Sequence, residues 1–171
     1  MTEEELAISR STPGARFDAP APAPTPVVAA KQDAAPVTTV APEVEAFVAQ
    51  LLADRAQPLV LFALEWCEFC WSLRKLFATL GVPYRSIDLD STAYQRDDRG
   101  GQIRALLAAR TGSRTIPQVF LGGRWLGGCT ETLELAKDGR LQALLTEHGV
   151  ACDDSVAIDP AALLPAWLQP R

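Results

Sequence analysis

Two cysteines three positions apart are the residues of this sequence best suited to chemistry. Cys67 and Cys70 form a C-x-x-C pair, whereas Cys129 and Cys152 stand apart from it. Such a pair supports thiol–disulfide exchange, in which a thiolate attacks a disulfide sulfur, or metal binding. A zinc site would need His148 and Cys152 as further ligands, and these follow the pair by the length of a whole fold. We therefore expect redox chemistry and no metal site.

The position of the pair between two elements makes it more informative than the motif alone. The apolar run 59–64 predicts a buried strand just before it. An apolar stripe predicts a helix that starts on the pair: Leu73, Leu76, Phe77 and Leu80. The unpaired amides and the dipole of a helix start favour a thiolate. Cys67, at or near the N-cap, should therefore attack, and Cys70, one turn inward, should resolve the mixed disulfide.

Charged residues on both sides of the pair act in opposite directions on a thiolate at Cys67. Glu65 and Glu68 flank this cysteine and oppose a second negative charge, whereas Arg74 and Lys75 favour it if they point back. The sequence leaves this balance open.

The remaining elements follow from hydrophobic periodicity and turn residues. The sequence predicts a helix from near Pro42, a strand over 84–89, a helix from about 103 that ends at Gly112, a hairpin over 117–126 turning at Gly122-Gly123, and two helical pieces from Thr130 to about His148. The resulting order is α-β-α-β-α-β-β-α. Its β-α-β start requires a parallel strand pair, whereas its last two strands are antiparallel.

Proline usage divides the chain of 171 residues into three parts. Seven of its 13 prolines fall within residues 1–42, an Ala/Pro-rich segment that we expect to be disordered and tether-like. Residues 43–150 carry the predicted elements and form the domain. Residues 151–171 form a C-terminal extension, for which we favour a strap on the domain's own surface. The tether leaves open that the domain works beside another protein.

Charge and hydropathy exclude some partners. The net charge of −5 argues against nucleic acid, because phosphate binding needs a basic excess on one face. No apolar run approaches the ~18 residues that a membrane span needs. The start MTEEELAISR is acidic where a secretory signal would be basic. We therefore expect a cytoplasmic protein, in a compartment where thiols stay reduced.

Four motifs in register resemble the glutaredoxin family, across about residues 61–141. They are W-C-E-F-C at 66–70, T-G-S-R-T-I-P at 111–117, G-G-C-T at 127–130, and the spacing from Ile103 to Thr111-Gly112. The resemblance implies an α/β, thioredoxin-like fold, with a four-stranded mixed sheet flanked by helices. It also implies a glutathione-dependent thiol–disulfide oxidoreductase that reduces protein disulfides or glutathionylated cysteines.

The resemblance also implies roles for individual residues. Cys67 would be the nucleophile and Cys70 the resolving thiol, with Phe69 beside them facing the substrate. Pro117 would be cis. Glutathione, as co-substrate, would be bound by Phe69, Arg104, Thr115, Ile116, Pro117, Gly128, Cys129 and Thr130. In this set the 128–130 amides would hold the γ-glutamyl carboxylate and Arg104 the glycyl carboxylate.

Departures from the family pattern motivate two alternatives. Phe69 is similar to the Cys-Gly-Phe-Ser subgroup that carries [2Fe–2S] clusters with glutathione as a ligand, although Cys70 replaces its serine. Leu64 stands where the family has a lysine, and Glu65-Trp66 is similar to thioredoxin. This second departure leaves open a thioredoxin-like electron carrier reduced by a reductase.

Overall fold

The computed structural model describes residues 39–168, so most of the segment expected to be disordered lies outside the described residues. The helices and strands of the described part follow the predicted order. They are α1 (Pro42–Ala53), β1 (Leu59–Ala63), α2 (Glu68–Thr79), β2 (Arg85–Asp88), α3 (Arg99–Thr111), β3 (Gln118–Leu121), β4 (Arg124–Gly127), α4 (Cys129–Lys137), α5 (Arg140–Glu147) and α6 (Pro160–Leu163), with short 3-10 turns at Thr92–Tyr94, Arg96–Asp98 and Ala166–Leu168.

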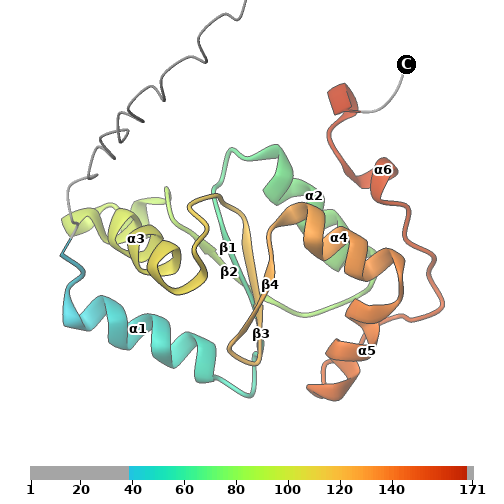
Figure 1. Cartoon of the computed structure of the whole chain (residues 1–171), viewed down its shortest axis with the longest axis horizontal. Coiled ribbons are helices and arrows are strands. Elements are labelled where there is room, and N and C mark those ends of the chain that lie inside the picture. The colour runs from blue at the N-terminus through green and yellow to red at the C-terminus, as the bar shows by residue number, and fades with distance from the viewer. Residues whose placement is uncertain (1–38, 169–171) are drawn as a thin grey trace, which may run out of the picture. The chain divides into compact units, whose positions relative to one another are not determined.

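The four strands form one mixed sheet in the order β2-β1-β3-β4 (Figure 1). β1 pairs parallel with β2 and antiparallel with β3, and β4 returns antiparallel to β3. All five residues of β1 are buried, as its uninterrupted apolar sequence predicts for a central strand. The predicted fold class is confirmed: α/β, with a thioredoxin-like, four-stranded mixed sheet flanked by helices.

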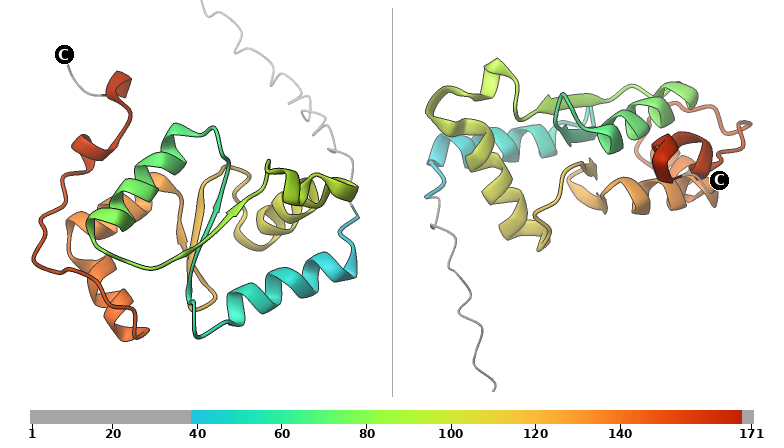
Figure 2. Two further views of the ribbon diagram at one scale, coloured as in Figure 1. Left: turned by 180° about the vertical axis from the view of Figure 1, so that it is seen from behind. Right: turned by 90° about the horizontal axis from the view of Figure 1, so that it is seen from above.

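Helices cover both faces of this sheet. Successive residues of a strand point to opposite faces, so Leu59, Leu61 and Ala63 of β1 pack with α2, α4 and α5. Val60 and Phe62 pack with α1 and α3 on the other face. Figures 1 and 2 show these two helix groups on opposite sides of the strands. The site helices α2 and α4 therefore share one face and pack against each other.

The folded part extends slightly beyond residues 43–150 at both ends. At the start, the backbone N–H of Ala41 donates to Oε1 of Gln102 at 2.8 Å, just before α1 begins. At the end, the backbone N–H of Asp153 donates to the Leu80 carbonyl at 2.8 Å, and Ile158 is buried in the core. The described part of the extension thus lies on the domain's own surface. Within residues 39–168, no helix is both long and apolar enough to cross a membrane.

Candidate active site

Cys67 caps the N-terminus of α2, as the sequence predicts. Its backbone is extended, and its Sγ accepts a hydrogen bond from the backbone N–H of Cys70 at 3.4 Å. The side chain is half-buried, so the sulfur occupies a site where helix-start amides stabilise negative charge and solvent still reaches it. This is the geometry that thiol–disulfide exchange requires of an attacking sulfur.

Cys70 lies in the first turn of α2 and is fully buried. The backbone N–H of Leu64 donates to its Sγ at 3.5 Å. Burial, and next the neighbouring Cys67, raise the pKa of the Cys70 thiol from 9.0 to about 12. Cys70 therefore keeps its proton at neutral pH as long as it stays buried. Both sulfurs are free thiols in this structure.

Two hydrogen bonds fix the turn that leads into Cys67. The backbone N–H of Glu65 donates to Oδ1 of Asp90 at 2.8 Å, and the Trp71 indole N–H donates to the Glu65 carbonyl at 2.8 Å. Trp66 follows this turn and is 84% exposed, with its ring edge-to-face on Trp71 at 6.2 Å between centroids. The turn therefore presents a large apolar side chain to solvent directly before the candidate nucleophile.

The charge balance that the sequence left open is partly resolved by an ion pair. Arg74 pairs with Asp88, an interaction that joins α2 to the end of β2. The Arg74 guanidinium is thus committed to a carboxylate, and it lowers the pKa of Cys70 only as a minor influence beside burial. Lys75, the next residue of α2 after Arg74, is exposed to solvent.

A buried glutamine organises the loop before β3. The Ile116–Pro117 peptide bond is cis, which confirms the prediction for Pro117. Gln118 is 1% exposed, and its Nε2 donates to the carbonyls of Ser113 at 2.8 Å and Thr115 at 3.2 Å. These bonds hold the loop that carries the predicted glutathione contacts Thr115, Ile116 and Pro117.

The start of α4 lies against this loop. Gly128 is its N-cap, and a Cβ added there would lie 3.3 Å from the Pro117 carbonyl oxygen. The backbone N–H of Gly128 donates to Oε2 of Glu131 at 3.0 Å, so that amide is already engaged. Cys129 is buried; burial, and next the nearby Cys67, raise the pKa of its thiol to about 11.

These contacts bring together three of the predicted segments. Cys129 lies within electrostatic reach of Cys67, and Gly128 lies against Pro117, so the dithiol, the cis-proline loop and the start of α4 surround one region. Arg104 is different: it is exposed on α3, and within residues 39–168 no hydrogen bond or ion pair joins it to these segments. Its role stays a prediction.

Four site residues were missed by sequence reasoning: Asp90, Gln118, Glu131 and Trp167. Asp90 was detectable in principle, since parallel pairing of β1 and β2 brings the residues after both strands together. Trp167 had no such signal. Its indole N–H donates to the Glu68 carboxylate, and its ring meets Phe69 edge-to-face at 6.1 Å between centroids.

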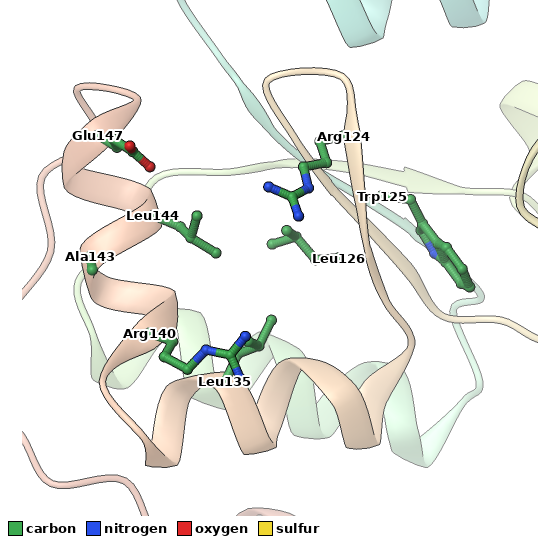
Figure 3. A pocket seen from close by; sticks show the side chains of 8 residues that line it. All are labelled: Arg124, Trp125, Leu126, Leu135, Arg140, Ala143, Leu144 and Glu147. Atoms are coloured by element: carbon green, nitrogen blue, oxygen red, sulfur yellow. The ribbon is translucent and has the colours of Figure 1, made fainter.

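A separate hollow lies between β4, α4 and α5 (Figure 3). The side chains of Arg124 and Arg140 point into it from opposite sides, and the apolar side chains of Leu126 and Leu144 lie between them in this view. None of the residues that line it belongs to the predicted site. Within residues 39–168, no cluster of three or more His, Cys, Asp or Glu side chains could hold a metal ion.

A thioredoxin-like fold with a dithiol at a helix N-terminus defines the class of thiol–disulfide oxidoreductases, and comparisons with known proteins narrow it. The Glutaredoxin family model matches residues 59–126. Glutaredoxin-C6 of Oryza sativa subsp. japonica is 40% identical over 92 residues, covering 54% of this chain and 78% of the relative. Glutaredoxin-C2 of Arabidopsis thaliana is 39% identical over 94 residues, covering 55% and 80%.

Solved structures agree with these matches. A buckwheat glutaredoxin–glutathione complex aligns with a TM-score of 0.57 and 38% identity over 64% of this chain and 93% of that one. Wheat glutaredoxin aligns with a TM-score of 0.56 and 41% identity over 63% of this chain and 97% of that one. The chain belongs to the glutaredoxin family and is a thiol–disulfide oxidoreductase.

Proposed function

We propose that the chain is a glutathione-dependent oxidoreductase that reduces glutathionylated cysteines and protein disulfides, with Cys67 as its nucleophile. The asymmetry of the two sulfurs carries this proposal. Cys67 Sγ is half-exposed and receives an N–H at the start of α2, whereas Cys70 is buried with a pKa of about 12. Only the first of these sulfurs is placed to meet a substrate from solvent.

With a glutathionylated cysteine as substrate, the Cys67 thiolate attacks the glutathione sulfur. The substrate's S–S bond breaks, a Cys67–glutathione disulfide forms, and the released substrate thiolate takes up a proton. A second glutathione, as thiolate, then attacks the glutathione sulfur of this intermediate. Oxidised glutathione leaves and the Cys67 thiolate is restored. The substrate gains two electrons and two glutathione units end as one disulfide.

With a protein disulfide as substrate, Cys67 forms a mixed disulfide with the protein and one protein thiol is released. Cys70 must then lose its proton and attack Cys67 Sγ, which releases the second protein thiol and leaves a Cys67–Cys70 disulfide. Two glutathione molecules reduce that bond. Because burial holds the pKa of Cys70 near 12, we expect loss of this proton to limit the rate of the internal step.

Glutathione would lie along Thr115–Pro117 and end at the start of α4. The related buckwheat glutaredoxin forms a complex with glutathione, which supports the same ligand here. The Gly128 N–H already donates a hydrogen bond to the Glu131 carboxylate. We therefore expect the γ-glutamyl carboxylate to be bound by the N–H groups of Cys129 and Thr130. Arg104 stays the candidate partner of the glycyl carboxylate.

The activity is tested by glutathione-driven turnover of a glutathionylated peptide, comparing the native chain with Cys67→Ser. Cys152→Ser is the matched control, because that thiol lies in the C-terminal extension outside the proposed site. Turnover by the native chain and by Cys152→Ser supports the proposal. Reduction by thioredoxin reductase without any dependence on glutathione would favour the carrier alternative instead. A colourless product after anaerobic iron–sulfur reconstitution contradicts the cluster alternative.

A further inference from the structure

The C-terminal extension passes beside the helix that carries the dithiol. Ile158 is buried in the core, and Leu163 and Leu164 are partly buried against it. Helix α6, which includes Leu163, packs against both α2 and α4, the two helices whose first turns frame the proposed site. Figure 1 shows the red segment running from α5 along the outer side of α4 toward the start of α2. These apolar anchors fix the approach of the last described residues.

Trp167, at the end of this path, contacts the two residues between the cysteines. Its indole N–H donates to the Glu68 carboxylate, and its ring packs edge-to-face on Phe69. The hydrogen bond and the ring contact restrain the indole in two directions. The side chain nevertheless remains 65% exposed, so most of it stands above the surface of α2.

Two pairs of large aromatic side chains therefore include residues next to the cysteines. Trp66 and Trp71 form the pair that includes the residue before Cys67. Phe69 and Trp167 form the other pair. The first pair belongs to the glutaredoxin-like part of the chain, whereas Trp167 is supplied by the extension.

We propose that Trp167 is a specificity-determining residue that limits the size of the disulfide substrate reaching Cys67; this rests on the proposed function. Its contacts go to the α2 side of the dithiol, not to Thr115–Pro117 or to Cys129. Of the residues predicted to bind glutathione, the indole meets Phe69 alone, so the glutathione half of a substrate keeps its other predicted contacts free of Trp167. A folded protein attached to the other sulfur must approach across a wider area, and there a restrained tryptophan is a steric obstacle.

The test is the ratio of kcat/KM for two substrates in the full-length chain. The small substrate is the mixed disulfide of glutathione and 2-mercaptoethanol, and the large one is glutathionylated serum albumin. Trp167→Ala should raise the large-to-small ratio several-fold, mainly through the large substrate. Trp167→Phe keeps a ring without the N–H and should stay close to the native ratio. Trp125→Ala is the matched control. Trp125 lines the separate hollow between β4, α4 and α5, so its replacement should leave the ratio unchanged.

The outcomes separate the two proposals. A native chain that turns over both substrates, with an unchanged ratio in Trp167→Ala, overturns the inference and leaves the proposed function standing. A lower ratio in Trp167→Ala also overturns it, because the indole would then assist protein docking. A native chain that turns over neither substrate contradicts the proposed function and this inference with it. Because Trp167 is largely exposed, its replacement should leave the thermal midpoint near the native value.

Discussion

The backbone N–H of Cys70 donates to Sγ of Cys67 at 3.4 Å, so the buried cysteine supports the half-buried one through its main chain. The contact needs the helix-start geometry but not the Cys70 side chain. A serine at position 70 would keep the same N–H. The two cysteines can therefore be separated experimentally: one variant removes the nucleophile, and the other removes only the internal resolving thiol.

Cys70→Ser should retain turnover of the small glutathione mixed disulfide, because glutathione itself resolves that intermediate. The same variant should lose most of its activity on a protein disulfide, since the trapped mixed disulfide then depends on an external thiol. Steady-state rates on the two substrates check this. Loss of both activities in a folded variant would show that Cys70 is needed for the first attack.

Folding stability should fall with pH above about 9 because of the buried thiols. Burial raises the pKa of Cys70 from 9.0 to about 12 and that of Cys129 to about 11. The folded chain therefore keeps protons that the unfolded chain releases, and unfolding is favoured as pH rises. Each such group accounts for up to about 1.4 kcal/mol per pH unit between its two pKa values. Urea unfolding at about pH 8 and about pH 10 measures the slope.

The comparison variant for this slope is Cys70→Ala. It should be less stable than the native chain at neutral pH, because it loses buried contacts, but its stability should decline less steeply with pH. Ser72→Ala is the control, since Ser72 is also buried on α2 and carries no group that ionises in this range. Equal slopes in Cys70→Ala and the native chain would mean that Cys70 does not stay protonated in the fold.

The sequence was sufficient for the fold and for the main segments of the site. The apolar run of β1 and the stripe of α2 are local patterns, and they place Cys67 at the N-cap without any long-range information. The positive backbone φ of Gly112, after α3, is likewise a local feature of a helix end. Such features are read from neighbouring residues, which is why their predicted positions agree with the structure.

Gln118→Ala should disturb the proposed glutathione-binding site. The Gln118 amide is buried and donates to the carbonyls of Ser113 and Thr115, so its removal takes away both hydrogen bonds and costs about 1–3 kcal/mol of stability. We expect a raised KM for glutathione with a smaller effect on kcat. Gln142→Ala is the matched control, because Gln142 is also buried but its side chain donates to the Ala136 carbonyl near the end of α4. It should destabilise the chain without changing that KM.

Glu131→Ala tests the cap at the start of α4. The lost bond from the Gly128 N–H should cost about 1 kcal/mol of unfolding free energy. Removing this carboxylate also frees the amide for an anion, so glutathione should bind at least as well as before. Glu134→Ala is the control, since that exposed residue only reaches Lys137 at 3.9 Å. An equal loss of stability in both variants would contradict the capping role.

Contacts between residues far apart in the chain could not be predicted from the sequence. Trp167 meets Glu68 across 99 positions, and no periodicity links a short tail to a helix start. Arg74 shows the same limit: its spacing allowed it to point back at the cysteines, but the structure pairs it with Asp88. Side-chain partners of this kind depend on how the elements pack, which composition and spacing do not encode locally.

The role of Cys67 as the attacking sulfur is tested most directly by glutathione-dependent turnover of a glutathionylated peptide by Cys67→Ser. We predict a rate no higher than that without enzyme, while Cys70→Ser and Cys152→Ser remain active. A Cys67→Ser rate close to that of the native chain would contradict it, because the attack would then come from another group.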